Sequence, residues 1–241
     1  MTAVSIDYII MDRLKHTTRK ANDFPCDLNK MKMRKCDCKH KIKKKQTNNS
    51  KTIVVNKYST QKKTNVLSKN DFLRLFGKEK KLSLLKKLSQ VGEFAARETV
   101  DIKGPKEKIF KIRIIGPFRE NSQVEISKTD GYKLGIMPPI RISGDIEDTP
   151  GIKVIGPHGS IKLNKGLIVA KRHIHMSEQD AKYFKVHSGQ IVSVKIMGER
   201  GLIYNNVIVR IDSSYRLSFQ IDTDEANAAD IEHSDQGILL R

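Results

Sequence analysis

The stretch LIVAKRHIHMSEQDAKYF, residues 167–184, decides the fold because it joins a strand, a histidine pair and a helix start. Its first residues are apolar and partly β-branched, which favours a strand, and residues two apart in a strand point to the same face. His173 and His175 therefore share one face. Two imidazoles on one face can bind a cation such as Zn²⁺, although a metal site needs further ligands from elsewhere. The pattern alone leaves two interpretations open, ordinary polar strand residues or a metal-binding pair.

A helix start follows the histidines directly. Ser177 offers a hydroxyl group suited to an N-cap, and Asp180 stands three residues later, where a capping box usually has Glu or Gln. We expect the helix to run through Ala181 to Phe184.

The pattern of a strand running into a helix start occurs a second time, earlier in the chain. LSKNDF at 67–72 echoes MSEQDA at 176–181, so Thr64 and Val66 correspond to the two histidines. An internal repeat of this kind predicts two related lobes, each contributing a strand-to-helix corner to one shared site.

Most of the chain beyond residue 52 has the pattern of strands. KIFKIRIIGPFR at 108–119 alternates apolar and basic residues, as in a half-buried strand, and NSQVEIS at 121–127 is again extended. One small helix is expected around 94–97. Three Gly-Pro pairs separate the strand runs, and helices are few and short. This organisation predicts a mostly β fold of small β-barrels with short capping helices, rather than a βαβ sheet.

The basic charge lies mainly in the first quarter of the chain. The 241 residues carry a net charge of +19, and residues 1–63 contain 17 Lys and Arg against 5 Asp and Glu. This concentration is typical of a solvated basic tail. No basic face interleaved with aromatic residues supports nucleic-acid binding, so nucleic acid is not an expected partner.

Composition also bears on location. No apolar stretch approaches the ~18 residues needed to cross a bilayer, so no membrane association is expected. Asp7 and Asp12 interrupt the apolar residues near the N-terminus, which argues against a secretory signal. The three cysteines all lie between Cys26 and Cys38 and cannot make a disulfide framework, which fits a reducing compartment. We therefore expect a cytoplasmic protein.

Residues 1–52 are expected to form an amphipathic helix followed by a basic, disordered tail. In SIDYIIMDRL, residues 5–14, apolar side chains recur at helical spacing, but so short a helix needs something to fold against. Residues 15–50 are polar and Lys-rich, as in a linker. Cys26, Cys36, Cys38 and His40 leave two interpretations open, free thiols or a structural zinc site, although their spacing does not match paired C-x-x-C knuckles.

Three separate blocks carry a resemblance to a known family. They are NSQVEISKTDGYKLGI at 121–136, VAKRHIHMSEQDAKYF at 169–184 and DTDEANAA at 222–229. Together they resemble the phosphate propanoyltransferase family, the PduL-type phosphotransacylases, and the resemblance runs from about Ile53 to Gln236.

The resemblance implies a metal and coenzyme A site between two β-barrel lobes. In the family, one metal ion, usually zinc, is held by a first His-x-His pair plus a glutamate, and another by a second pair plus a later histidine. His173 and His175 correspond to the second pair, Glu125 to the glutamate, and Arg119 to the phosphate-binding arginine. Without the resemblance, Arg119 reads as a surface residue and Glu125 as a solvated strand residue.

Three positions depart from the family pattern. Thr64 and Val66 stand where the first pair belongs, and Gln220 stands where the later histidine belongs. Thr and Gln are poor zinc ligands and Val is none. We therefore expect at most one zinc ion per chain, bound through the remaining histidine pair with Glu125 nearby.

The repeat and the resemblance together predict intertwined connectivity. Residues 53–62 with 171–241 are expected to form one barrel lobe, and residues 63–170 the other.

Two functions follow as expectations. The first is a phosphate acyltransferase that moves a short, propanoyl-like acyl group between coenzyme A and phosphate, so acyl-CoA and phosphate are the expected substrates. The alternative, kept open by the three departures, is a non-catalytic relative acting as a binding or microcompartment-associated component. A short N-terminal helix directs some family members into a shell, so residues 5–14 are a candidate shell contact and a bacterial microcompartment a candidate location.

Overall fold

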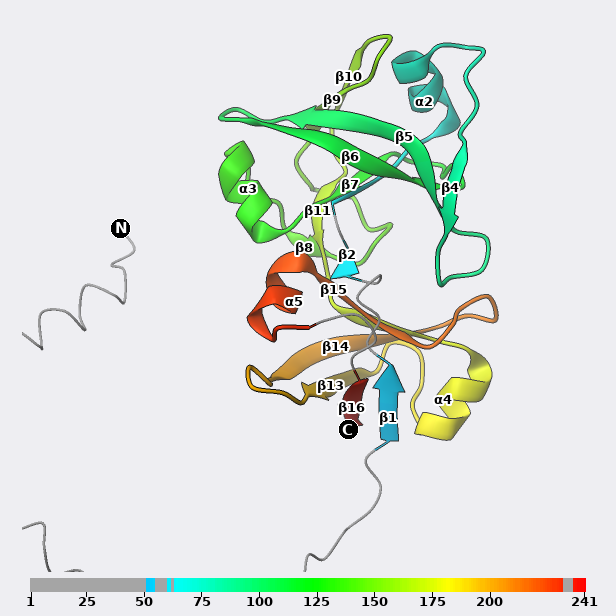
Figure 1. Cartoon of the computed structure of the whole chain (residues 1–241), viewed down its shortest axis with the longest axis vertical. Coiled ribbons are helices and arrows are strands. Elements are labelled where there is room, and N and C mark those ends of the chain that lie inside the picture. The colour runs from blue at the N-terminus through cyan, green and yellow to red at the C-terminus, as the bar shows by residue number, and fades with distance from the viewer. Residues whose placement is uncertain (1–50, 55–59, 62, 232–235) are drawn as a thin grey trace, which may run out of the picture. The chain divides into compact units, whose positions relative to one another are not determined.

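Strands dominate the computed structural model, which describes residues 51–54, 60–61, 63–231 and 236–241. They form two sheets, each curled into a half-barrel, and only four short helices occur in these ranges (Figure 1). The predicted mostly β fold class is therefore confirmed. None of the helices in the described ranges is long and apolar enough to cross a bilayer. The sequence predictions for residues 1–50, including the helix at 5–14, lie outside the described residues.

The seven-stranded sheet combines two short early strands with the C-terminal part of the chain. Its strands, in spatial order, are β1 (Lys51–Val54), β16 (Gln236–Leu240), β13 (Ile191–Ile196), β14 (Ile203–Ile211), β12 (His173–Met176), β15 (Ser218–Asp222) and β2 (Thr60–Gln61).

The nine-stranded sheet is built from the chain between these two parts. Its strands, in spatial order, are β10 (Ser160–Leu163), β9 (Ile152–Ile155), β5 (Phe94–Lys103), β6 (Lys108–Gly116), β3 (Thr64–Val66), β7 (Gln123–Glu125), β11 (Leu167–Ala170) and β8 (Ile140–Arg141), with β4 (Leu84–Lys87) paired to β5. The chain therefore passes from one sheet to the other after β2 and returns between β11 and β12.

The helix expected around 94–97 is wrong, because these residues begin strand β5. Phe94 lies opposite Gly116 of β6, and Ala95 lies opposite Ile115. On its other side β5 pairs with β4. Strand partners on both edges satisfy the backbone of this segment, and such tertiary pairing overrides local helix preference.

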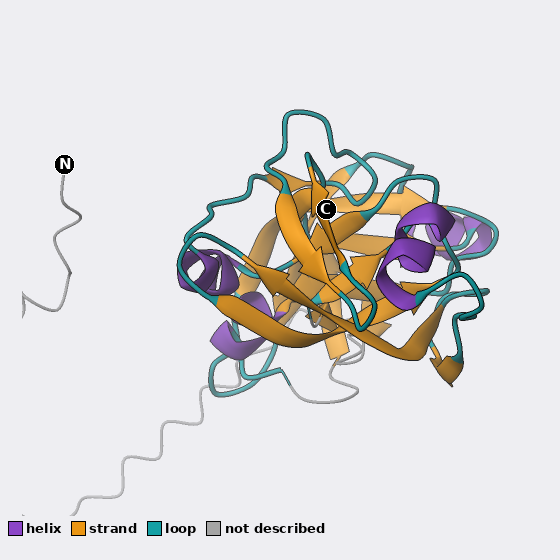
Figure 2. Ribbon diagram, turned by 90° about the horizontal axis from the view of Figure 1, so that it is seen from above, coloured by secondary structure: helices purple, strands orange, loops and turns teal. Residues whose placement is uncertain are grey.

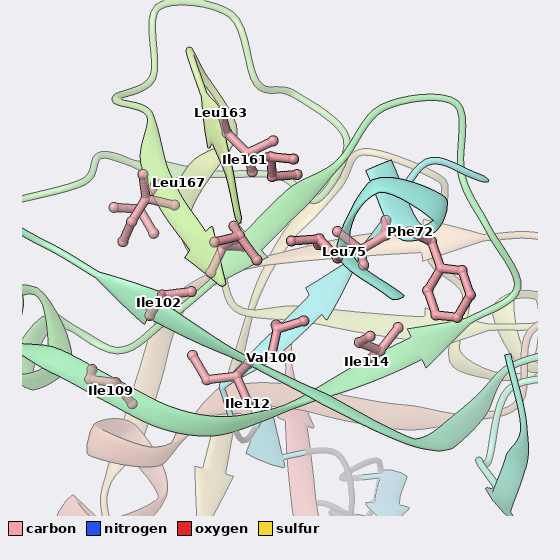
Figure 3. Close-up of a cluster of buried hydrophobic side chains, with 14 of the residues drawn as sticks. Phe72, Leu75, Val100, Ile102, Ile109, Ile112, Ile114, Ile161, Leu163 and Leu167 are labelled. Carbon is pink, nitrogen blue, oxygen red and sulfur yellow. The ribbon is translucent and has the colours of Figure 1, made fainter. Parts of the chain in front are cut away.

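Each sheet has its own hydrophobic core. The core of the nine-stranded sheet includes Phe72, whose ring is fully buried and stacks on Phe76 at 4.6 Å between ring centroids. Six strands contribute apolar side chains to this core, and Figure 3 shows part of it. The second core gathers around Phe184 and Phe219 beneath the seven-stranded sheet. Each sheet packs on its own core, and this packing holds its strands in place.

All four helices begin at the same kind of corner, where a strand runs directly into an N-cap. The helices are α2 (Lys69–Phe76), α3 (Lys128–Leu134), α4 (Glu178–Phe184) and α5 (Thr223–Ala228), and they lie at the periphery of the strands (Figure 2). Their N-caps are Ser68, Ser127, Ser177 and Asp222, and each cap side chain accepts a hydrogen bond from the backbone N–H three residues later. The predicted cap at Ser177 is confirmed, and the corner predicted to occur twice occurs four times.

Candidate functional site

Each of the four corners carries two side chains on its strand, two and four residues before the N-cap. The residues two and four positions before the caps are Val66 and Thr64, Glu125 and Gln123, His175 and His173, and Gln220 and Ser218. Each cap residue has an extended backbone, so it continues the alternation of its strand. The cap thereby fixes which face of the strand these side chains occupy.

Strand pairing then brings the corners together two by two. In the nine-stranded sheet, Thr64 of β3 lies opposite Glu125 of β7. In the seven-stranded sheet, His173 of β12 lies opposite Gln220 of β15. The two halves are therefore laid out alike, although they carry different side chains.

Six of these eight side chains, all but Gln123 and Ser218, line a single cavity of about 500 Å³ to which both sheets contribute. The four residues predicted from the sequence, Arg119, Glu125, His173 and His175, all lie on its wall. The three departing positions line it too. Five cationic residues, Lys63, Lys86, Arg113, Arg119 and Arg210, face two acidic ones, Glu93 and Glu125. A cavity with this charge balance favours anionic ligands.

His173 is held in one tautomer by its own strand. Its Nδ1 lies 2.8 Å from the backbone carbonyl oxygen of Lys171, which can only accept a hydrogen bond. Nδ1 must therefore carry the proton, and Nε2 keeps its lone pair. A metal-binding histidine is commonly oriented in this way.

His175 lies beside His173, with 4.6 Å between the ring centroids, and stacks on Tyr215 at 4.0 Å. Both of its ring nitrogens are buried and have no hydrogen-bond partner in the described part of the chain. Buried polar atoms are normally satisfied, so these nitrogens suit a ligand that the protein alone does not supply.

Both imidazoles are neutral at physiological pH. Burial lowers the pKa of His173 to about 4. Burial also lowers the pKa of His175 to about 3, with further contributions from His173 and from the positive charges of Arg210 and Arg119. The neutral imidazole is the form that binds a metal ion.

Glu125 is buried in the half of the cavity opposite the histidines. Gln123 Nε2 donates a hydrogen bond to its Oε1 at 2.6 Å, and Thr64 Oγ1 donates to its Oε2 at 3.4 Å. Burial raises the pKa of this carboxyl group, against the lowering effect of a hydrogen bond with Ser143 and of the Arg119 charge. Gln123 and Glu125 are two residues apart on β7 and so share one face, which allows this hydrogen bond.

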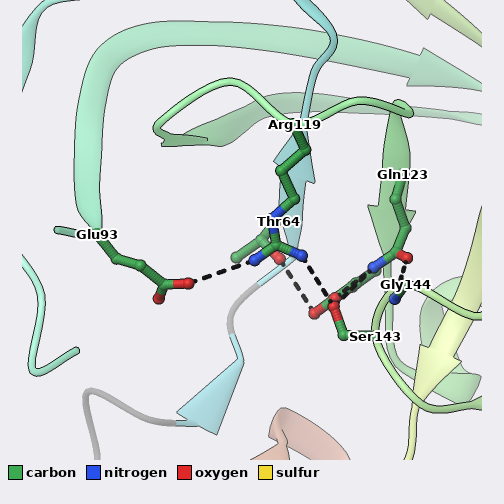
Figure 4. Close-up of polar contacts among 7 residues, drawn as sticks. Thr64, Glu93, Arg119, Gln123, Ser143 and Gly144 are labelled. Atoms are coloured by element: carbon green, nitrogen blue, oxygen red, sulfur yellow. Dashed lines mark hydrogen bonds and ion pairs between the residues drawn. The ribbon is translucent and has the colours of Figure 1, made fainter. Parts of the chain in front are cut away.

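Arg119 reaches the cavity from a loop fixed at the β3–α2 corner, where its backbone N–H donates to the carbonyl oxygen of Leu67 at 3.0 Å. Its Nη1 donates to Ser143 Oγ at 3.2 Å, and its Nη2 lies 3.3 Å from Glu93 Oε1 (Figure 4). The side chain is still 40% exposed, so its planar fork of donors can receive another anion.

Gln220 is committed to a hydrogen-bond network. Its Nε2 donates to Ser218 Oγ at 2.9 Å, and the same oxygen accepts from Gln90 Nε2, also at 2.9 Å. Gln90 comes from the loop between β4 and β5, and its Oε1 accepts from the backbone N–H of Arg216. The loop thereby ties the nine-stranded sheet to the seven-stranded sheet beside the site. Sequence reasoning missed Gln90 and Ser143, and their local sequence gives no signal for either contact.

The histidine pair fits a metal ion only as part of a ligand set. His173 Nε2 and the unpartnered nitrogens of His175 are suitable donors. In the described ranges, however, no group of three or more His, Cys, Asp or Glu side chains is arranged to hold a metal ion. Two imidazoles would therefore leave the other coordination positions to groups from outside this set.

A β protein whose cationic cavity carries a neutral imidazole pair is suited to anionic, metal-assisted chemistry. The sequence profile of the phosphate propanoyltransferase family matches residues 60–232. The chain is 50% identical to a phosphate propanoyltransferase of Thermotoga maritima over 68% of this chain and 78% of that protein. It is 51% identical to the one of Salmonella arizonae over 66% and 76%, and 48% identical to the one of Clostridioides difficile over 67% and 78%. The chain belongs to the phosphate propanoyltransferase family, and this membership supports a phosphate acyltransferase function.

The histidine pKa values predict how stability depends on pH in protein stripped of metal with EDTA. An unfolded histidine titrates near 6.5, whereas the folded values are about 4 and about 3. Below pH 6.5 these two histidines bind protons in the unfolded chain but stay neutral in the folded chain. The free energy of unfolding should therefore fall as pH drops from 6.5 to 4, by about 1.4 kcal/mol per pH unit for each histidine.

Urea unfolding at a series of pH values measures this slope. His175→Phe, which keeps a ring against Tyr215, should flatten it, while the exposed His187→Phe serves as the matched control. An unchanged slope in His175→Phe would contradict the assignment.

Proposed function

We propose that this protein transfers a short, propanoyl-like acyl group between coenzyme A and phosphate. In the forward direction a phosphate oxygen forms a bond to the acyl carbon, the carbon–sulfur bond breaks, and coenzyme A leaves as a thiolate that takes up a proton. The observation that supports this reaction best is the convergence of Arg119, Glu125, His173 and His175 on one cationic cavity. Acyl-CoA and phosphate are both anionic, as such a cavity requires.

Arg119 is the residue we assign to phosphate. Phosphate carries about two negative charges near neutral pH, and a guanidinium group meets two of its oxygens with two parallel N–H donors. Ser143 and Glu93 hold the guanidinium from two sides, so its direction is set before substrate arrives. Preset geometry lowers the entropy lost on binding.

His173 and His175 are the residues we assign to at most one zinc ion, with Glu125 nearby. Such an ion would polarise the acyl carbonyl group and favour the thiolate form of coenzyme A. The protein's own contribution is the fixed tautomer of His173 and the neutral state of both rings.

A non-catalytic relative is the second candidate, and Gln220 is the observation that favours it. This residue stands where the family pattern has a metal-binding histidine, and its amide is engaged with Ser218. A coupled assay of acyl-CoA formation from acyl phosphate, run with zinc supplied, separates the two functions. Absence of turnover with every short acyl phosphate would end the enzyme proposal.

We predict that Arg119→Lys lowers kcat/KM for acyl phosphate about tenfold or more, because a lysine cannot make the paired contact and charged hydrogen bonds are worth about 1.5–3 kcal/mol. The loss should appear chiefly as a raised KM for phosphate or acyl phosphate. The exposed Arg200→Lys is the matched control and should leave the kinetics unchanged. Removal of residues 1–50 should also leave turnover nearly intact. An unaffected Arg119→Lys enzyme would show that the phosphate site lies elsewhere.

We predict at most one zinc ion per chain in freshly purified protein, because Thr64, Val66 and Gln220 supply no imidazole. Elemental analysis at known protein concentration measures the content. His173→Ala should remove whatever zinc is present, while His158→Ala, at an exposed position, should not. Two stoichiometric ions per chain would contradict the prediction.

Residues 5–14 are the segment we assign to contact with a bacterial microcompartment shell, because their apolar spacing suits a helix that docks on another surface. Deleting residues 1–20 should release a fluorescent fusion from shells into the cytoplasm, as seen by microscopy. Retention of the truncated fusion in shells would refute the role of this segment.

A further inference from the structure

The face of the nine-stranded sheet that lines the cavity carries one polar row of side chains. Strand β3 lies between β6 and β7, and its Thr64 is opposite Arg113 on one side and Glu125 on the other. All three residues line the cavity. Polar contacts of the site therefore continue along this row.

A second row, next to the first, is apolar. The parallel register that sets Thr64 beside Arg113 sets Val66 beside Ile115, because both strands advance by two residues. On the other edge of β6, Ile115 lies opposite Ala95 of β5. Val66, Ile115 and Ala95 all line the cavity, as do Leu85 of β4 and Leu88, which follows it. We call these five residues the apolar wall.

The apolar wall leaves hydrophobic surface uncovered inside a charged cavity. Leu85 is 46% exposed, although it lies beside the site that Arg119 and the histidines form. Exposed apolar surface in a site rimmed by polar groups is typical of ligand recognition. Of the parts of the proposed substrates, phosphate is ionic and coenzyme A is rich in phosphates and amides, so the acyl chain alone is apolar throughout.

We propose that the apolar wall binds the acyl chain and sets the chain length that the enzyme accepts, an inference that rests on the proposed function. Val66 is central to it, because its buried apolar side chain lies two residues along β3 from Thr64, next to the polar row. Within the wall, Val66, Ile115 and Ala95 form a row across three neighbouring strands, about 10 Å at the usual spacing, and β4 with Leu85 lies on the far side of β5. The small side chain of Ala95 leaves a gap between Ile115 and β4, and the size of residue 95 limits the room for the chain there.

Two substitutions change the wall in opposite directions. Ala95→Val fills the gap between Ile115 and β4, and Val66→Ala removes apolar volume at the end of the row that lies on β3. Each methylene group buried in an apolar site favours binding about fourfold, and one that does not fit is rejected more strongly. The ratio of kcat/KM for butanoyl-CoA to that for acetyl-CoA should fall about tenfold or more in Ala95→Val and rise about threefold in Val66→Ala.

Phosphate-dependent release of the coenzyme A thiol measures the ratio, and the exposed Ala228→Val is the matched control. Calorimetric titration of the wild type and both wall variants with coenzyme A, acetyl-CoA and butanoyl-CoA gives the same comparison without turnover. A chain-length ratio that neither wall variant moves would overturn the apolar wall while leaving the proposed transfer intact. If the wild type binds these ligands but transfers nothing, the proposed function fails, and the calorimetric ratios alone then support or overturn the wall.

Discussion

The first backbone N–H groups of every helix have no partner within the helix, and satisfying them is the constraint on which this structure depends. Four times the chain meets it by running a strand straight into a Ser or Asp whose side chain accepts one of these N–H groups. In three corners the N3 carboxylate also accepts from the cap's own N–H. In the fourth, Ser122 bridges Ser68 and Asp71 instead. Because the cap is extended, this bond fixes the phase of the strand before it.

The four corners form one site because each cap fixes which side chains of its strand point to which face of the sheet. With the cap fixed, the side chains two and four residues earlier have one available direction. Pairing of β3 with β7 and of β12 with β15 then sets the corners opposite one another. The same layout yields unlike halves, because one half carries Thr64, Val66 and Glu125 while the other carries two histidines and Gln220. The apolar wall and the polar row thus both lie on the nine-stranded sheet, and the histidine pair lies on the seven-stranded sheet.

Local sequence was enough to predict much of this, because the signals lie within a few residues of one another. The cap at Ser177, the shared face of His173 and His175, and the mostly β class all follow from short-range pattern. What the sequence could not supply is contact over long separations. Gln90 and Ser218 are 128 positions apart, and the residues next to them in the sequence do not predict their hydrogen bond. The segment beginning at Phe94 was mistaken for a helix for the same reason, since its strand partners are set by the whole sheet.

The N-cap bonds separate what folds a corner from what the corner displays. The hydroxyl or carboxylate that stabilises the turn belongs to the cap and to the third residue of the helix, whereas the displayed side chains make no bond that the turn needs. Ligand chemistry can therefore be exchanged during evolution without loss of the scaffold. Thr64 and Val66 on one corner, Gln220 on another and the two histidines on a third show how unlike the side chains on corners of one geometry can be. A corner of this kind holds its two strand side chains in place whatever their chemistry. Four such corners allow one architecture to form many different binding sites.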